Sequence, residues 1–261
     1  MKFNNLSGTV KVLIVCLCIT IMIFIASFVY YGNINSAEDP RTLPAKTLQL
    51  QYEKQLEEKH TSEGLDILNQ MLTIYLSLPD YKESYEVGVI YNNIASIYLV
   101  QLETEILTNK DITKDELVMN LDLASQFTQK SIDNYEKWLA ENGSLSEQQI
   151  REKITPFYDP KNPAFNNADL DRVIDKRIND IMIAQIETKR RLSVSLTNMG
   201  VVNRYQGNLE LAKANYEKAI VLWDKNYTAQ DNLNILMDQP IQKRSIISRL
   251  FPPEKIGKLE E

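Results

Sequence analysis

The chain has 261 residues, of which 44% are hydrophobic and 25% charged, with only 8 glycines and 9 prolines. This length allows one large domain or two small ones, and the abundance of Leu, Ile, Glu, Lys and Gln favours an all-α fold. The formal net charge is −6 and no acidic residue precedes Glu38, so the main domain is acidic and a poor candidate for binding nucleic acid.

Residues 12–31 form an uncharged, largely apolar run of 20 residues. A helix of this length crosses the roughly 30 Å hydrocarbon core of a bilayer, whereas the apolar stretch of a cleaved signal peptide has only about 7–15 residues. We therefore expect an uncleaved transmembrane helix, with Tyr30 and Tyr31 at the headgroup level. The alternative is a signal peptide cleaved after Ala37, although Asn35 at the −3 position fits a cleavage site poorly.

The charges that flank this run predict its orientation. Lys2 and Lys11 lie in the segment 1–11 before it, and Glu38 is the first charged residue after it. The positive-inside rule then places residues 1–11 in the cytosol and the main domain on the extracytoplasmic face, which is the periplasm in a Gram-negative bacterium. We expect a single-pass membrane protein that contacts the lipid bilayer through residues 12–31.

Few residues of the domain can carry chemistry. Cys16 and Cys18 both lie in the apolar run, so the domain beyond it has no disulfide, no thiolate nucleophile and no cysteine-based metal site. His60 is the sole histidine, is expected in a turn between helices, and cannot alone supply the ligands of a catalytic zinc site. A phosphate-binding loop and a G-x-S-x-G elbow are absent from the sequence. We therefore expect no catalysis, no cofactor, no metal and no small-molecule substrate.

The first part of the domain alternates helical patterns with short turns. Residues 32–44 contain Pro40 and Pro44 without apolar periodicity, which indicates a linker. Over residues 45–142 we expect a helix at about 47–59, a second helix capped by Thr61 or Ser62 and ended by Pro79, and two more at about 81–104 and 114–139.

Residues 143–167 interrupt this alternation. Pro156, Pro160 and Pro163 occur there among aromatic residues that look exposed, which predicts an irregular surface loop, and long loops are often functional. From residue 168 the pattern is helical to about Tyr205, either as one helix or with a break near Arg190.

The end of the chain has the pattern of capping helices. Residues 168–238 contain the long helix and the pair described next, and residues 239–261 form a capping helix and tail. Helical patterns at 226–239 and 241–251 would cover the open end of a helical stack with four apolar residues: Ile241, Ile247, Leu250 and Phe251.

Small and aromatic residues recur at fixed spacing in residues 192–226. Their order is Leu196-x2-Met199-Gly200-x2-Asn203, then Gly207 at a turn, then Ala212-x3-Tyr216 and Ala219. This pattern resembles the tetratricopeptide repeat (TPR), a 34-residue helix–turn–helix with the signature W-x2-L-G-x2-Y…A-x3-F…P. The departures from it are Leu196 for the large aromatic residue, Asn203 for Tyr and Asp224 for the terminal Pro. The resemblance implies that two helices approach closely at Gly200, Ala212 and Ala219.

Weaker matches precede this unit. Tyr91-x2-Ile94-Ala95-x2-Tyr98 matches the first helix of the motif. Its second helix comes late, and two registers are open: one places Ala124, Ser131 and Ile132 at the small and apolar positions, and the other uses Leu123, Phe127 and Lys130. Residues 47–78 form a degenerate first pair. Generic antiparallel helix pairs are the alternative interpretation of these segments.

The resemblance implies an irregular TPR-like α-solenoid of stacked helix pairs, in which the first helix of each pair lines a curved surface. Partner-binding residues are then expected at Asn92, Asn93, Ser96, Val194, Thr197, Asn198, Val201, Arg204 and Tyr205. Asn93 and Asn198 take the same repeat position, where an amide can bind a peptide backbone or, as the alternative, bond within its own helix pair.

These expectations together favour an interaction protein. The sequence predicts a membrane-anchored TPR scaffold or adaptor that binds a protein or peptide partner at the extracytoplasmic face, without catalysis. The alternative is a fixed structural or assembly subunit of a membrane protein complex, with residues 143–167 as a docking element.

Overall fold

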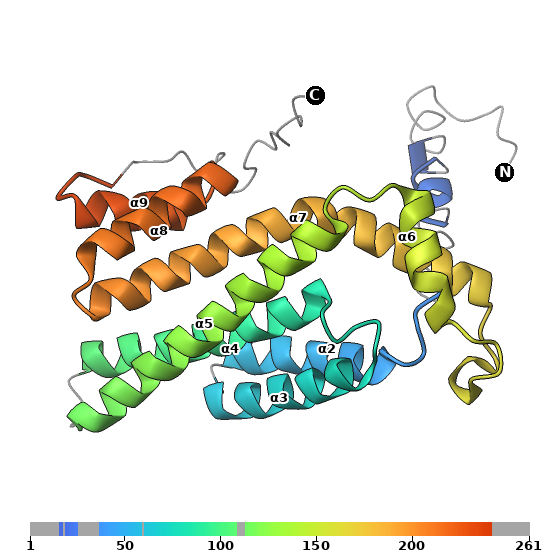
Figure 1. Ribbon diagram of the computed structural model, residues 1–261, viewed down its shortest axis with the longest axis horizontal. Helices are drawn as coiled ribbons and strands as arrows, with labels where there is room; N and C mark the ends of the chain where they lie inside the picture. The colour runs from blue at the N-terminus through green and yellow to red at the C-terminus, as the bar shows by residue number, and fades with distance from the viewer. Residues whose placement is uncertain (1–15, 18, 26–36, 59, 109–112, 242–261) are drawn as a thin grey trace, which may run out of the picture.

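The computed structural model describes residues 16–17, 19–25, 37–58, 60–108 and 113–241. From residue 37 onward the described residues contain helices and no strand (Figure 1), which confirms the all-α class. The helices are α2 (Leu43–Glu58), α3 (Thr61–Ser77), α4 (Tyr85–Thr108), α5 (Lys114–Asn142), α6 (Glu147–Ile154), α7 (Leu170–Tyr205), α8 (Leu209–Leu222) and α9 (Tyr227–Leu236). Two short 3-10 helices lie between α6 and α7, namely η2 (Thr155–Phe157) and η3 (Pro163–Phe165).

The expected membrane span of residues 12–31 lies mostly outside the described residues. Residues 16–17 and 19–25 are helical and exposed. Among the helices that the structure describes, none combines the length and the apolar character needed to cross a bilayer. The anchor and its orientation therefore stay predictions.

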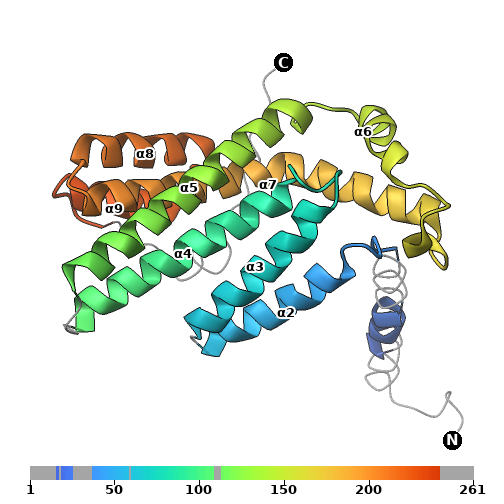
Figure 2. The same ribbon diagram turned by 60° about the horizontal axis from the view of Figure 1, so that its bottom comes forward.

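Successive helices pack in pairs. Helix α2 packs against α3, α4 against α5, and α7 against α8, and the two helices of each pair run in opposite directions (Figures 1 and 2). Helix α5 also packs along α7, and α9 packs along α8. The pairs consequently lie side by side in chain order (Figure 2).

Small residues hold the α7–α8 pair together. Gly200 is buried against Tyr216, whose ring would overlap a Cβ at that position, and Ala212, Tyr216 and Ala219 are fully buried. Gly207 at the turn has a φ of +80°, a left-handed conformation that glycine adopts without strain. The close approach of the two helices expected at these residues is confirmed.

The α4–α5 pair has the same kind of contact at a position that the pattern did not indicate. A Cβ on Gly88 would lie 2.5 Å from Tyr135 Cε1, and Ser131 Oγ donates a hydrogen bond to the Gly88 carbonyl at 2.9 Å. Gly88 and Tyr135 thus face each other in the same way as Gly200 and Tyr216 do in the α7–α8 pair. This contact lies two helical turns before Ala95, the small residue of the motif matched on this helix.

The two registers expected for α5 differ in how deeply their residues are buried. Ala124, Ser131 and Ile132 are buried, whereas Phe127 is half-buried and Lys130 is exposed. The Lys130 ammonium lies 4.8 Å from the centre of the Phe127 ring on the surface of the pair. Phe127 also packs on α4, because its ring centre lies 6.1 Å from that of Tyr91 and 6.2 Å from that of Tyr98. Residues of both registers therefore contact the partner helix, and those of the first are the more deeply buried.

The cap predicted for the second helix is wrong. Helix α3 begins at Thr61 itself, and the N-cap position belongs to His60, which makes no side-chain cap hydrogen bond. The Thr61 hydroxyl accepts a hydrogen bond from Gln101 Nε2 at 3.1 Å instead. A contact with α4 therefore replaces the local cap at this hydroxyl.

Residues 143–167, called the insert below, are ordered rather than an irregular surface loop. A capping box of Ser146 and Gln149 starts α6, and Pro156 and Pro163 lie in the first turns of η2 and η3, where a missing N–H removes no helical bond. Four residues of the insert pack with Trp138 and the first half of α7: Ile150, Ile154, Tyr158 and Phe165. The expectation failed for Tyr158 and Phe165, which pack on Trp138 and α7, whereas Phe157 is exposed as expected.

Helix α7 is continuous over 36 residues, about 54 Å at 1.5 Å per residue, and has no break near Arg190. The first half of α7 packs against the insert and its second half packs against α8, so this one helix connects the two regions (Figure 1). Helix α9 corresponds to the first capping pattern, and Asn226 Oδ1 caps it by accepting from Ala229 N at 3.0 Å. The second capping pattern, 241–251, lies outside the described residues except for Ile241.

Candidate functional site

Residues 37–42, called the strap below, connect the N-terminal segment to α2. Asp39 closes a turn here, because its Oδ1 accepts from Arg41 N at 2.9 Å and its carbonyl accepts from the Thr42 hydroxyl at 3.0 Å. Ala37, Asp39 and Thr42 are buried. The expectation of a simple linker is therefore wrong for this part of the chain, which is folded onto the domain.

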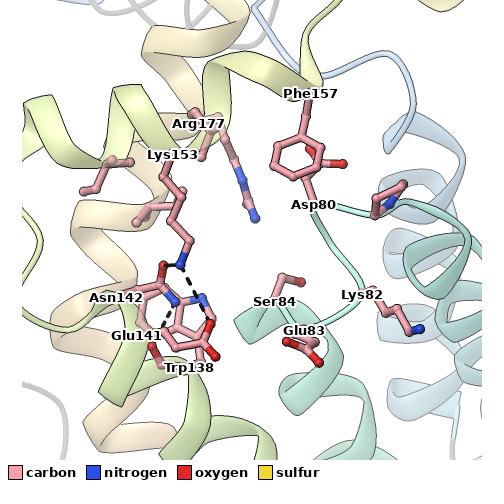
Figure 3. Close-up of a pocket in the computed structure, with 14 residues that line it drawn as sticks. Asp80, Lys82, Glu83, Ser84, Trp138, Glu141, Asn142, Lys153, Phe157 and Arg177 are labelled. Carbon is pink, nitrogen blue, oxygen red and sulfur yellow. Dashed lines mark hydrogen bonds and ion pairs between the residues drawn. The ribbon is translucent and has the colours of Figure 1, made fainter.

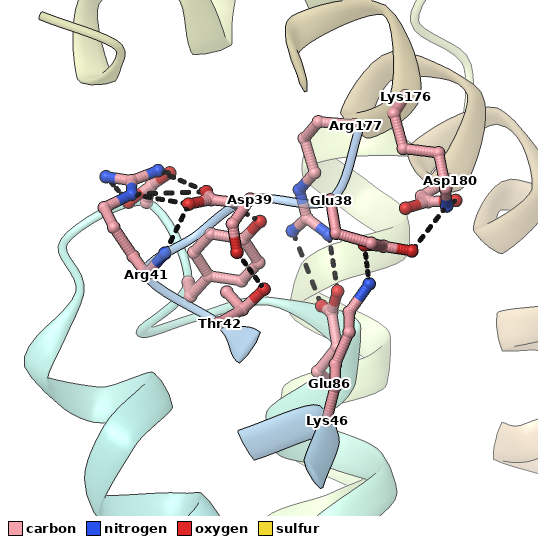
Figure 4. Close-up of polar contacts among 11 residues, drawn as sticks. Glu38, Asp39, Arg41, Thr42, Lys46, Glu86, Lys176, Arg177 and Asp180 are labelled. Carbon is pink, nitrogen blue, oxygen red and sulfur yellow. Dashed lines mark hydrogen bonds and ion pairs between the residues drawn. The ribbon is translucent and has the colours of Figure 1, made fainter. Parts of the chain in front are cut away.

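Arg41 joins the strap to two other segments. Its Nη2 lies 2.7 Å from Asp39 Oδ2 and 2.7 Å from Asp80 Oδ2, which belongs to the turn between α3 and α4. Its Nη1 donates to the Phe157 carbonyl of the insert at 3.3 Å. The guanidinium also lies over the ring of Tyr158, 4.8 Å from its centre. One side chain thus binds the strap, the α3–α4 turn and the insert. Figure 4 shows its contacts with Asp39.

A second buried ion pair lies beside the first. Arg177 of α7 pairs with Glu86 of α4 through both of its Nη atoms, and its guanidinium lies 4.1 Å from the centre of the Tyr81 ring. The Tyr81 hydroxyl donates to Asp39 Oδ2 at 3.2 Å and so links this pair to the strap. The two ion pairs therefore form one network.

The network ends at the start of α2. Glu38 pairs with Lys46 of α2 and, at 3.5 Å, with Lys176 of α7, which also pairs with Asp180 (Figure 4). We call the charged residues of this network the ionic clamp: Glu38, Asp39, Arg41, Lys46, Asp80, Glu86, Lys176, Arg177 and Asp180.

Burial and pairing act in opposite directions on the pKa values of the clamp. Burial disfavours the charge on Arg41, but its hydrogen bond and ion pair with Asp39, together with Asp80, raise its pKa. Burial raises the pKa of Asp80, and Arg41 offsets only part of that increase. Burial alone would raise the pKa of Glu86, but the charge of Arg177 and the hydrogen bonds to the carboxylate together outweigh it and hold this pKa below its ordinary value. The Glu86–Arg177 pair is thus stabilised in its charged form.

The clamp can fix the strap, but its charges are already compensated. Within the described residues, each of its four cations has an acidic partner. Removing charges from water costs free energy, which close geometry and additional hydrogen bonds offset. The arrangement therefore holds the strap, the α3–α4 turn, the insert and α7 in one body.

The residues expected to bind a partner lie on α4 and α7, and some of them bond to each other. Asn92 Oδ1 accepts from Ser195 Oγ at 2.9 Å and from Asn198 Nδ2 at 3.1 Å. Asn198 Nδ2 also lies 3.2 Å from Ser96 Oγ, and Ser131 of α5 is 2.9 Å from Ser195. These residues form a polar seam between the two helix pairs, in which the Asn198 amide bonds to the neighbouring pair rather than within its own.

The other expected residues are placed differently. Thr197 and Val201 are buried, and the Thr197 hydroxyl accepts from Asn226 Nδ2 at 2.9 Å. Arg204 Nη1 donates to Asn232 Oδ1 of α9 at 3.2 Å. Three more side chains are at least partly accessible: Asn93, Val194 and Tyr205. The structure therefore brings together Asn92, Ser96 and Asn198, and leaves the remainder spread along the two helices.

The sequence pattern missed the ionic clamp because its members are far apart. Asp39 falls in a stretch interpreted as a linker and Asp80 in a turn, where charged residues are ordinary. Arg177 carried the one readable signal, since it lies in the apolar stripe of α7 beside Ile174 and Ile178. A charged residue on a buried helical face needs a partner, but the sequence does not say which.

His60 is exposed at the α2–α3 turn, where its Nδ1 lies 3.0 Å from Gln55 Oε1. In the described part of the chain, no group of three or more His, Cys, Asp or Glu side chains could hold a metal ion.

Comparison of the chain with protein-family models, with curated proteins and with solved structures finds no match.

Proposed function

We propose that the protein is a membrane-anchored, TPR-like scaffold that binds a protein or peptide partner at the extracytoplasmic face, without catalysis. The observation that carries this proposal is the contact between glycine and tyrosine in two successive helix pairs, Gly88 with Tyr135 and Gly200 with Tyr216. Stacked helix pairs of this kind form extended surfaces suited to binding other chains.

The strap supports a role close to the membrane. Five residues, 32–36, separate the expected membrane span from the strap, and a chain of this length reaches at most about 18 Å. Because the ionic clamp fixes the strap to the helix pairs, a domain on such a short connection is held near the bilayer surface with restricted orientation.

The partner surface is proposed along α4 and α7. Arg204 and Tyr205 at the end of α7 are partly accessible, and the Arg204 guanidinium lies 5.5 Å from the centre of the Tyr205 ring. An arginine in this position can pair with a carboxylate of a partner. Asn93 of α4 and Val194 of α7 are also partly accessible.

Crosslinking in native membranes, followed by mass spectrometry, tests this proposal. We expect the wild-type chain to crosslink to a partner protein, and Arg204→Glu or Asn198→Ala to remove those crosslinks. Lys218→Glu on the exposed side of α8 is the control and should leave them intact. If both α7 variants retain every crosslink of the wild type, the proposed surface is wrong.

A fixed structural or assembly subunit of a membrane complex is the second candidate. It is favoured by the polar seam, because the amides of Asn92 and Asn198 are already bonded inside the protein. Purification in mild detergent separates the two candidates. A scaffold should exchange its partner and also occur alone, whereas a fixed subunit should always copurify with one assembly at constant stoichiometry.

A further inference from the structure

A cavity of about 190 Å³ lies next to the ionic clamp (Figure 3). The α3–α4 turn, the end of α5, the insert and α7 surround it. Its apolar lining comes from Pro79, Trp138, Ile150, Ile154, Phe157 and Ile181. Trp138 and the three isoleucines are buried, whereas Phe157 is 40% exposed and stands at the rim.

The volume of this cavity limits what it can hold. Pockets for cofactors and drug-sized ligands have about 300–1,000 Å³, whereas an apolar cavity of about 150 Å³ admits benzene. A volume of about 190 Å³ is therefore suited to one aromatic ring or one branched aliphatic side chain.

The charges around the cavity favour an uncharged occupant. Arg177 is paired with Glu86 and Asp80 with Arg41. Lys153 Nζ donates to Asn142 Oδ1 at 2.9 Å, and Glu83 pairs with Lys137 at 2.7 Å. The Lys82 side chain extends away from the cavity (Figure 3). A charged ligand would have to displace one of these partners, whereas an apolar group could contact the apolar part of the lining without displacing any of them.

We propose that this cavity is the docking site for one apolar side chain, of the size of phenylalanine or leucine, from a protein partner. This inference rests on the proposed scaffold function. It places one anchoring contact with the partner at the cavity beside the insert, in addition to the surface along α4 and α7. Interfaces concentrate much of their binding free energy in a few anchor residues that fill well-packed pockets surrounded by polar groups. Here the exposed rim residues Glu83, Glu141 and Lys153 surround a floor of tryptophan and isoleucine.

Two capped pentapeptides, Ser-Gly-Phe-Gly-Ser and Ser-Gly-Ala-Gly-Ser, test the site on the full-length chain in lipid nanodiscs. The chain has two tryptophans, so Trp223→Phe leaves Trp138 in the cavity as the sole reporter. We expect the phenylalanine peptide to shift the Trp138 emission to shorter wavelength and to bind at least tenfold more tightly than the alanine peptide.

A matched pair of variants localises the binding. Phe157→Ala removes the rim ring but keeps the carbonyl that binds Arg41, and should weaken the phenylalanine peptide at least fivefold. Met182→Ala removes an apolar side chain of similar exposure, 41%, outside the cavity lining and should have no effect. Circular dichroism of both variants checks that they are folded.

Equal binding of the two peptides, or unchanged binding by folded Phe157→Ala, would overturn the cavity assignment. Crosslinking in native membranes is a separate readout of the scaffold function. If no partner is crosslinked but the peptides are still discriminated, the scaffold proposal fails and the cavity assignment holds. If a partner is crosslinked and the peptides are not discriminated, the cavity assignment alone fails.

Discussion

The α7–α8 pair and the ionic clamp are both closely packed, but different interactions hold them. In the helix pair, Gly200 and alanines let a tyrosine ring approach the facing helix. In the clamp, buried and partly buried charges pair across the strap, α2, the α3–α4 turn, α4 and α7. Small-residue packing joins neighbours in sequence and leaves a periodic signature, whereas charge pairing joins distant residues and leaves almost none.

Breaking the clamp should have the largest effect on stability. Arg177→Met leaves Glu86 buried without its partner, and the free energy of unfolding should fall by about 3–5 kcal/mol. Glu86→Leu combined with Arg177→Met removes both charges and should recover most of that loss. Urea unfolding of the full-length chain, followed by circular dichroism, measures both. A single variant as stable as the wild type would contradict a stabilising clamp.

Adding one methyl group to a helix pair should have the next largest effect. Gly200→Ala places a Cβ against the Tyr216 ring and should destabilise the protein by about 1–3 kcal/mol, and Gly88→Ala should do the same against Tyr135. Gly64→Ala is the matched control, because its nearest contact is the flexible end of Ile97 at 3.3 Å. In thermal unfolding, the melting temperature of Gly64→Ala should be well above those of Gly200→Ala and Gly88→Ala.

Removing one hydrogen-bonding group from the polar seam should cost less. Asn198→Ala removes the bonds to Asn92 and Ser96 and should lower the free energy of unfolding by about 1 kcal/mol. Gln148→Ala on the exposed surface of α6 should change it by less than about 0.5 kcal/mol. Equal urea midpoints for the two variants would show that the seam adds no stability.

The smallest expected effect is a change in pH dependence. The pKa of Glu86 is lower in the folded chain than its ordinary value of 4.5. Its contribution to the free energy of unfolding is therefore fully present above pH 4.5 and is lost as the pH falls through the folded pKa. The pKa of Asp80 is raised above its ordinary value of 3.8. Its contribution to the free energy of unfolding is therefore fully present below pH 3.8 and is lost as the pH rises through the folded pKa.

Stability measured at several pH values below 6 separates these two groups. Glu86→Gln should flatten the loss of stability on acidification, whereas Asp80→Asn should steepen it. Parallel curves for the wild type and both variants would be inconsistent with the opposite pKa shifts.

Local patterns were enough to predict the helical class, the α7–α8 turn at Gly207 and the small residues that bring those helices together. The motif match on α4 did not include Gly88, whose close contact with Tyr135 lies two helical turns before Ala95. Local patterns failed for the insert, since the burial of Tyr158 and Phe165 depends on Trp138 and α7 rather than on their neighbours in sequence.

The expected partner residues had a similar outcome. The pattern placed Asn92, Ser96 and Asn198 on the first helices of two helix pairs, but it could not tell that they bond to one another across the seam. Nor could it reveal the strap, because Asp39, Asp80 and Phe157 meet at Arg41 only after the whole domain has folded.

Hydrogen exchange of the full-length chain in lipid nanodiscs tests most directly the central claim that the strap belongs to the folded body. In the wild type, the amide of Thr42, bonded to Asp39 O, and that of Tyr158, bonded to Thr155 O, should exchange slowly. In Arg41→Ala both segments should lose protection together, while α8 keeps its own. Fast exchange of the strap in the wild type, or loss of protection in only one of the two segments, would contradict the claim.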